Sequence, residues 1–564
     1  MTQTEFLQTG PVHKNAFDDD RALRELLERK LPKNVWRDIQ GGLHALGQRA
    51  IDEIRPLGDA CEQNNPRHLP YDAWGHRIDL IQTDPAWNTL AGIAAQEGIV
   101  ATGYERTHEE WSRLHQFVRV YLYNPYSAIF SCPLAMTDGA ARLIDTYGDA
   151  ELKSRALPRL LSRDPATFWP SGQWMTERSG GSDLAGSETE ARQEGGQWRL
   201  YGTKFFTSAA TSPMAMTLAR LPGAPAGSRG LSLFYVESGQ AEGRWNNIEV
   251  LRLKNKLGTR ALPTAEFRLN GTPATLVGGE GHGIKKIATL FNITRIHNAV
   301  CAVGLMSRAL SVARDFSYKR SAFGRSLASM PLHLETLATM QVEYEGALHL
   351  VMYIAELLGR EETEVADPDE IAVLRLLTPI AKLYTGKQGI AVTSECVEAL
   401  GGTGYMEDSG MPRWLRDAQT LAIWEGTTNV LSLDTLRAIE HDKAWEPYVR
   451  SVHGRLVGIT APELKASAAR TQMGLDALNQ YLPHAMGQGL DFIQGGARSF
   501  AYSVARVFVA SLLLEHAEAL LRQSKDKGQH AALTARRWCA QELTPLAQVD
   551  AVHREESRIL ALDL

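Results

Sequence analysis

The stretch that decides the fold and chemistry of this chain is Ile423-Trp424-Glu425-Gly426-Thr427-Thr428-Asn429. In it a carboxylate, Glu425, stands between an aromatic residue and a glycine. A glycine-rich run, Leu400-Gly401-Gly402-Thr403-Gly404-Tyr405, lies upstream, and Leu415-Arg416-Asp417-Ala418 lies between the two. A lone acid is ordinarily a surface charge, but a tryptophan beside it excludes water. The stretch therefore singles out Glu425 as a candidate site residue.

The bulk composition sets wide limits. A chain of 564 residues is too long for one hydrophobic core, so several domains are expected. The formal net charge of -5 gives no reason to expect a nucleic-acid partner. The cysteines are widely spaced with no CxxC pair, which argues against a zinc site or a disulfide framework and fits a reducing, cytoplasmic setting. The N-terminal stretch lacks an apolar signal segment, and no apolar run is long enough to predict a membrane span.

Hydrophobic spacing divides the first half of the chain into two parts. Residues 1–167 are predicted to be helical, with a helix over Arg21–Leu31 and a surface loop over Pro66–Asp84. Residues 168–275 alternate like strands, and Gly195-Gly196 separates two of them as a hairpin turn. We therefore predict an N-terminal helical domain followed by a middle β domain.

Helical spacing returns after the β domain. A long helix is predicted from Gly283 to about Tyr318, and further helical runs cover 332–358, 371–399 and 416–439. These runs indicate a helical bundle over residues 276–444. Residues 445–564 are predicted to form an extra helical domain with a break around Gly495-Gly496. The fold class is thus mixed α and β, mostly helical.

Three more runs have residue types suited to a cofactor. Trp174-Met175-Thr176-Glu177-Arg178-Ser179-Gly180-Gly181-Ser182-Asp183 opens the β domain, where a threonine hydroxyl and close backbone approach suit a heterocycle and a phosphate. Gly202-Thr203-Lys204-Phe205-Phe206-Thr207-Ser208 follows, and Arg320-Ser321-Ala322-Phe323-Gly324 lies beyond the β domain. An arginine fork suits the anionic oxygens of a pyrophosphate. Each run also has an ordinary alternative, since glycines serve turns and helix ends, and phenylalanines serve cores.

Together these runs resemble the acyl-CoA dehydrogenase family, and the resemblance covers nearly the whole chain. Residues 424–429 resemble its (W/Y)EGT run, residues 174–183 its (M/L)TExx(A/G)GSD run and residues 202–208 its GxKxWITN strand. Pro331 and Glu398 stand where the family often has glutamine, and with Ser131-Cys132-Pro133 they point to the AidB-like branch. The implied fold is the acyl-CoA dehydrogenase fold with an extra C-terminal helical domain.

The resemblance implies FAD as the cofactor and assigns residues to it. Phe206 takes the position that packs on the flavin ring, and Ser208 takes the position whose hydroxyl contacts flavin N5. Arg320 takes the position that binds the pyrophosphate. The implied cofactor-binding residues are Trp174, Met175, Thr176, Gly181, Ser182, Phe206, Thr207, Ser208, Arg320, Phe323, Glu398, Gly401, Gly402, Thr427 and Asn429.

The resemblance also implies an acyl-CoA substrate. Glu425 would remove the α-proton while flavin N5 accepts the β-hydrogen as hydride. Arg295 matches a family position, whereas Asn292 replaces the usual acid; the alternative for Arg295 is a solvated face or an ion pair. The implied substrate-binding residues are Ser182, Asn292, Arg295 and Gly426, and no metal is expected.

Two functions stay open from the sequence. The first is an FAD-dependent dehydrogenase of an acyl group on CoA or on a carrier protein, with an unidentified electron acceptor. The second is an AidB-type flavoprotein with weak turnover and a binding or DNA-protection role. Residues 441–564 carry 14 basic and 13 acidic side chains, a formal charge of +1, which argues against nucleic acid. The expected partners are an acyl-CoA and further copies of the chain, as a homodimer or homotetramer, with no membrane.

Overall fold

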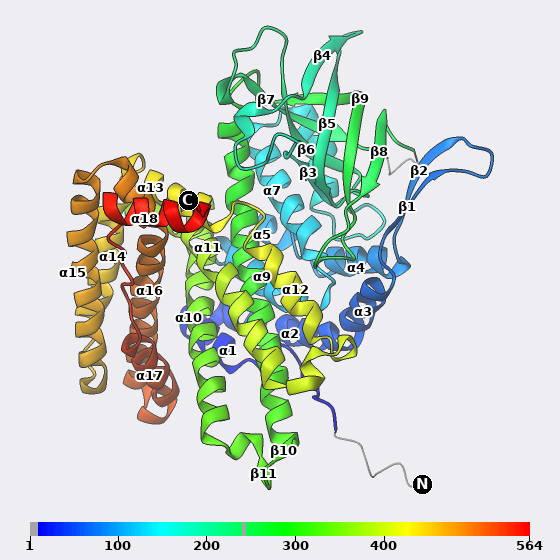
Figure 1. Cartoon of the computed structure of the whole chain (residues 1–564). Coiled ribbons are helices and arrows are strands. Elements are labelled where there is room, and N and C mark those ends of the chain that lie inside the picture. The colour runs from blue at the N-terminus through cyan, green and yellow to red at the C-terminus, as the bar shows by residue number, and fades with distance from the viewer. Residues whose placement is uncertain (1–8, 240–243, 564) are drawn as a thin grey trace, which may run out of the picture. The chain divides into compact units, whose positions relative to one another are not determined.

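A computed structural model describes residues 9–239 and 244–563 of the chain (Figure 1). These residues form two compact units. One contains residues 14–17 and 39–301, and the other contains residues 9–13, 18–38 and 302–563. Residues 1–8, which begin the stretch interpreted as lacking a signal segment, lie outside the described residues. The division into four domains stays a prediction.

The N-terminal part is mostly helical, as predicted. Its first helix is α1 (Arg21–Lys30), which Asp20 caps by accepting a hydrogen bond from the backbone N–H of Leu23. The helices that follow are α2 (Lys33–Arg49), the π-helical turn η1 (Ala50–Ile54), α3 (Arg55–Gln63), α4 (Pro85–Gln96), α5 (Ala101–Glu105), α6 (Ser112–Tyr123), α7 (Ser131–Tyr147) and α8 (Ala150–Leu160).

The prediction of a loop over Pro66–Asp84 was wrong. This segment is an antiparallel hairpin of β1 (Arg67–Tyr71) and β2 (Arg77–Gln82), which projects from the helices in Figure 1. Asp72 holds the turn by accepting bonds from the backbone N–H groups of Trp74 and His76. The buried Asp79 carboxylate accepts a bond from the N–H of Val250, so a distant strand fixes the hairpin. The many turn-forming residues of the segment indicated a loop, and the bond to the distant Val250 could not be predicted from the local sequence.

In the described part of the middle β domain, seven strands form one sheet. They are β3 (Ser171–Trp174), β4 (Glu190–Glu194), β5 (Gln197–Ser208), β6 (Met214–Arg220), β7 (Leu231–Glu237), β8 (Ile248–Leu253) and β9 (Thr264–Val277). Gly195 and Gly196 form the predicted hairpin turn between β4 and β5, both with positive φ. Because β5 pairs with β9, β9 with β7 and β7 with β6, while β3 pairs with both β5 and β6, the strands close on themselves.

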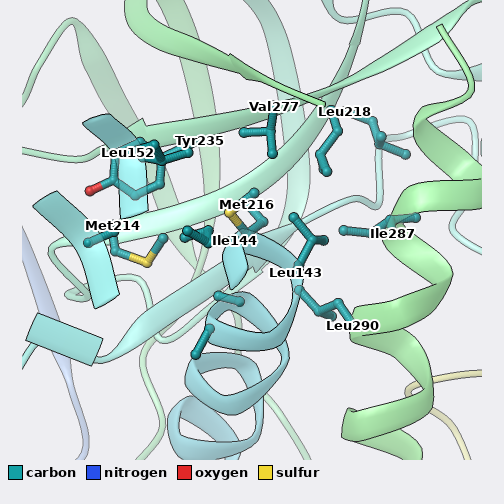
Figure 2. Packing of buried hydrophobic residues seen from close by; sticks show 14 of the residues in the cluster. Leu143, Ile144, Leu152, Met214, Met216, Leu218, Tyr235, Val277, Ile287 and Leu290 are labelled. Atoms are coloured by element: carbon teal, nitrogen blue, oxygen red, sulfur yellow. The ribbon is translucent and has the colours of Figure 1, made fainter. Parts of the chain in front are cut away.

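Strands β6 and β7 are buried on both faces. Ala215 on β6 and Phe234 on β7 point into one core inside the sheet, which also holds Trp174 and Phe267. The alternate residues point into a second core, where they meet helices α7, α8 and α9 (Figure 2). The labelled members of this second core are Leu143, Ile144, Leu152, Met214, Met216, Leu218, Tyr235, Val277, Ile287 and Leu290.

The second unit contains the predicted bundle. Its elements are the end of α9 (Gly283–Lys319), the short strands β10 (Ser321–Ala322) and β11 (Arg325–Ser326), α10 (Pro331–Glu362), α11 (Pro368–Ala399), the 3₁₀ turn η8 (Gly401–Tyr405), α12 (Met411–Leu421) and α13 (Thr428–Glu440). The predicted continuous helix over 416–439 was wrong, because α12 ends at Leu421 and α13 starts only at Thr428. The interruption contains Glu425.

The extra domain packs on the bundle within the same unit. It consists of α14 (Trp445–Val457), α15 (Lys465–Gly487), α16 (Leu490–Gln523), α17 (Lys525–Ala540) and α18 (Ala551–Leu562). The indole of Trp538 on α17 lies directly against Gly346 on α10, leaving no space for a Cβ there. The predicted break at Gly495-Gly496 was wrong, since α16 runs through both glycines. The chain instead turns at Gln488 and Gly489.

One described helix, α9, is long and apolar enough to cross a membrane by length and composition alone. Its most apolar window is 94% buried inside the protein. Burial of this kind is what a core helix shows, and α9 supplies Ile287 and Leu290 to the second core.

Candidate active site

Glu425 lies in the six-residue interruption between α12 and α13, here called the base loop (Ala422–Thr427). The loop starts as a tight turn in which the N–H groups of Ile423 and Trp424 both donate to the carbonyl of Thr420. Trp424 and Glu425 are half-buried. The loop therefore presents the predicted base at a bend rather than on a helix face.

The backbone of the base loop is unusual at two consecutive residues. Glu425 has φ +59° and Gly426 has φ +105°. The left-handed region is natural for glycine but unfavourable for glutamate, and such conformations gather at functional sites. The carbonyl of Gly426 accepts a 2.6 Å hydrogen bond from Nζ of Lys382 on α11. The sequence reading missed Lys382, although a single cation within the apolar run from Leu376 to Leu383 was a usable signal.

The other predicted residues of this unit lie at exposed positions. Arg320 follows α9, and Phe323 forms the tip of the β10–β11 hairpin, where its side chain is 98% exposed. Gly401 has φ +61°, whereas Gly402 has neither a positive φ nor any atom within 4 Å of where a Cβ would stand. The remaining members, all exposed, are Glu398, Thr427 and Asn429.

The β domain holds a second group of predicted residues. Thr176 lies two residues after the end of β3, and its carbonyl accepts a bond from the N–H of Phe205 on β5. Phe206 is 46% exposed, and Ser208 is half-buried with its hydroxyl 3.4 Å from that of Thr264. Position 181 has room only for glycine, because a Cβ there would stand 2.5 Å from Oγ1 of Thr176. Thr176, Phe206 and Ser208 therefore keep side-chain surface available to a ligand, as do the exposed Gly181 and Ser182.

Three predicted residues have side chains engaged in the interior instead. Trp174 is fully buried against Phe267, and Met175 points into the second core. Thr207 is fully buried and donates its hydroxyl to the carbonyl of Ala265. The side chains of these three residues therefore contact the protein itself.

A buried ion pair fixes the loop that begins at Thr176. Nζ of Lys204 lies 2.7 Å from Oε1 of Glu177, and both side chains are buried. Glu177 also accepts bonds from the hydroxyl of Thr189 and the N–H of Glu188. Burial alone would raise the pKa of Glu177, but Lys204 and these donors hold it below its ordinary value. The ion pair and these hydrogen bonds therefore hold the loop that begins at Thr176 against strand β5.

A cation lies beside the predicted flavin-packing residue. Nζ of Lys254 stands over the rings of Phe205 and Phe206, 3.1 and 4.6 Å from their centroids. The same ammonium is 2.7 Å from the buried Glu266 carboxylate, which also pairs with Arg252. The Lys254 ammonium therefore contacts both rings and the Glu266 carboxylate together.

Asn292 and Arg295 lie on α9, three residues apart, and both are half-buried. This spacing places them on one helix face, as predicted. Among residues 9–239 and 244–563, no group of three or more His, Cys, Asp or Glu side chains is arranged to hold a metal ion.

Four family models match the chain in succession. They are the adaptive response protein AidB N-terminal domain (residues 8–165), the acyl-CoA dehydrogenase middle domain (172–272), the acyl-CoA dehydrogenase C-terminal domain (281–439) and the acyl-CoA dehydrogenase 11 C-terminal domain-like model (443–563).

Relatives match over most of their length. Acyl-CoA dehydrogenase family member 11 of Caenorhabditis elegans is 42% identical over 95% of this chain and 89% of that protein. AidB of Escherichia coli (strain K12) is 32% identical over 78% of this chain and 81% of its own. The crystal structure of C. elegans ACDH-11 in complex with C11-CoA covers 100% of this chain and 98% of its own, with 39% identity and a TM-score of 0.95. The chain therefore belongs to the acyl-CoA dehydrogenase family.

Within the family it is AidB-like, with the extra C-terminal domain of ACDH-11. It is accordingly an acyl-CoA dehydrogenase with FAD as its cofactor. The residues present fit that cofactor. Gly402 is a glycine that no contact in the described chain demands, and Phe206 is a large ring left open to a ligand.

Proposed function

We propose that the protein oxidises an acyl-CoA thioester across its Cα–Cβ bond, with Glu425 as the base that takes the α-proton. The single observation that carries the proposal is the base loop, a break between two helices that holds a glutamate in left-handed backbone. FAD, when bound, supplies N5 as the acceptor of the β-hydrogen and its electron pair. The carboxylate of Glu425 receives the proton, and the half-buried Trp424 beside it limits the access of water.

The substrate class rests on the relatives. ACDH-11 of C. elegans was crystallised in complex with C11-CoA, which supports a CoA thioester and suggests an acyl chain of that length as a first choice. Thr176, Phe206, Ser208 and Arg320 are proposed as flavin contacts. Asn292, Arg295 and Ser182 are proposed as substrate contacts, and the electron acceptor is left open.

The experiment is anaerobic flavin reduction by a panel of acyl-CoAs that includes C11-CoA. Glu425→Gln should keep its fold and yellow FAD spectrum but lose roughly 10²–10⁴-fold in reduction rate, the usual worth of a general base. Glu440→Gln, an exposed acid on the neighbouring helix α13, is the matched control and should behave as wild type. Near wild-type reduction by Glu425→Gln would show that the base lies elsewhere.

We also propose that the active form is a homodimer or homotetramer. A phenylalanine that is 98% exposed at φ +51° is costly to keep, and Tyr318 and Leu332 near the same hairpin in sequence are 72% and 83% exposed. A second copy covering this hairpin explains all three. Light scattering of wild type and Phe323→Ser would test it, with dissociation expected for the variant and an unchanged mass contradicting the proposal.

The alternative role of an AidB-like protein in DNA protection has less support. The extra domain is almost neutral, so it predicts no strong release of counterions from a duplex. Tight, steeply salt-dependent binding of duplex DNA that Arg536→Ala/Arg537→Ala weakens would favour this role instead.

A further inference from the structure

Lys382 is a fully buried lysine in the middle of α11. Its side chain has 0% exposure, and its neighbours Ile380, Ala381 and Leu383 are buried apolar residues. Burying an ammonium costs free energy unless hydrogen-bond acceptors or an opposite charge compensate it, so a buried lysine calls for an explanation. One bond of the ammonium goes to the base loop, to the carbonyl of Gly426.

The Lys382 ammonium forms a hydrogen bond with the residue that follows the proposed base. Nζ lies 2.6 Å from the carbonyl oxygen of Gly426. This carbonyl belongs to the residue whose φ of +105° follows the +59° of Glu425. A charge-assisted bond is stronger than a neutral one and is well suited to hold a backbone shape that glutamate disfavours.

The same face of α11 also contacts the end of α12, where the base loop begins. Gly386 lies one turn after Lys382, and a Cβ there would stand 2.7 Å from the carbonyl oxygen of Leu421, where α12 ends. Residues four apart on a helix share a face. One face of α11 thus contacts both ends of the interruption. Gly386 leaves space for the carbonyl of Leu421, and Lys382 donates to the carbonyl of Gly426.

We infer that Lys382 is a positioning residue for the dehydrogenation, one that fixes the left-handed turn at Glu425 and so the direction of its carboxylate. This inference rests on the proposed role of Glu425 as base. Removal of a proton from carbon needs the carboxylate oxygen aligned with the C–H bond, and a displacement of about 1 Å costs roughly 10²-fold in rate. Lys382 acts on the backbone of the loop and need not touch substrate or cofactor.

The test uses the full-length FAD-loaded enzyme and anaerobic flavin reduction by the best acyl-CoA of the panel. Lys382→Met removes the donor while keeping the length of the side chain, and Lys382→Gln keeps a neutral donor. Lys286→Met is the matched control, since Nζ of Lys286 also bonds glycine carbonyls, those of Gly279 and Gly281 at 2.7 and 2.9 Å, and belongs to the other compact unit.

We expect Lys382→Met to keep its FAD and its KM within about threefold but to lose about 10- to 100-fold in kcat, the scale of a lost supporting contact. Lys382→Gln should fall between it and wild type, and Lys286→Met should match wild type. In a Glu425→Gln background, Lys382→Met should cost nothing further, because it acts through that carboxylate.

Wild-type kcat in Lys382→Met, or an equal loss in both backgrounds, would overturn the inference and leave the proposed function standing. If Lys382→Met does not fold, Lys382→Gln measured in both backgrounds decides by the same two criteria. A wild-type enzyme whose flavin no acyl-CoA reduces would remove the proposed function, and this inference with it.

Discussion

The base loop and the second turn of α16 are two places in one compact unit where local sequence misleads in opposite directions. Residues 416–439 have the spacing of one helix, yet the helix stops for the base loop. Residues 490–523 contain two adjacent glycines, yet α16 continues through them. Whether each helix stops depends on the contacts beside the segment as well as on the glycines within it.

The neighbours account for both outcomes. At the base loop, Gly386 admits the end of α12 and Lys382 bonds the carbonyl of Gly426. In α16, Gly495 and Gly496 face Val549 and Tyr481, and a Cβ at either position would collide with them. Glycine supplies conformational freedom at Gly426 and space at Gly495 and Gly496. The same residue type thus breaks one helix and allows another to pack.

The largest expected effect concerns the packing that surrounds α16. Trp538 is fully buried, its ring lies against Gly346, and its Nε1–H donates to the carbonyl of Arg506 on α16 at 3.0 Å. Trp538→Ala should lower the free energy of unfolding by about 3–5 kcal/mol because it leaves a large cavity. Trp74→Ala is the control, since Trp74 is 84% exposed and its loss should be nearly neutral. Denaturant unfolding measures both; equal stabilities would mean that the extra domain does not depend on this contact.

The next effect tests conformational freedom in the base loop. Gly426→Ala adds a Cβ at φ +105°, 2.8 Å from Cδ2 of Leu431. The turn should shift, and the rate of flavin reduction should fall about 10²-fold with FAD still bound. Stopped-flow absorbance of the flavin measures it. A wild-type rate would indicate that the positive φ at Gly426 is not needed to aim Glu425.

A smaller loss is expected from the packing glycine of α16. Gly496→Ala drives a methyl group into the Tyr481 hydroxyl, which otherwise donates to the carbonyl of Ala547 at 3.0 Å. We expect a loss of about 1–3 kcal/mol from overpacking. Gly487→Ala, where a Cβ meets nothing within 4 Å, should instead stabilise α15 by up to about 1 kcal/mol. Stabilisation by Gly496→Ala would show that Gly496 is not there for space.

The smallest effect is a dependence on pH where α16 meets α10. The rings of His349 and His516 lie 4.6 Å apart, and burial, with Arg29 and Lys30 nearby, lowers the pKa of His516 to about 3. The unfolded histidine titrates near 6.5, so stability from this group is complete above that pH and declines as the pH falls toward 3. At pH 5 the loss should be about 1–2 kcal/mol. Thermal unfolding between pH 7 and 5 should show a weaker slope for His516→Gln than for wild type; an identical slope would exclude His516 as its source.

Much of the architecture could be predicted from the sequence. The long helices α9, α10 and α11, the strands β7 and β9 and the Gly195-Gly196 turn were predicted, because each has a strong local period or a turn residue at a fixed place. The family and its FAD cofactor were likewise predicted, and both are confirmed. Glu425 was singled out by its neighbours in sequence, and its role as base stays a prediction.

What the sequence by itself determined is the set of residue types and their order along the chain, which is enough for the class of fold and for singling out Glu425 as the predicted base. Tertiary structure decided the rest. Lys382 is 43 positions from Glu425 and meets its loop only because α11 folds back beside the end of α12. Asp79 makes a hairpin out of an apparent loop only because Val250 is there to bond. A hydrogen bond between distant segments leaves no period in either one, so no local pattern can reveal it.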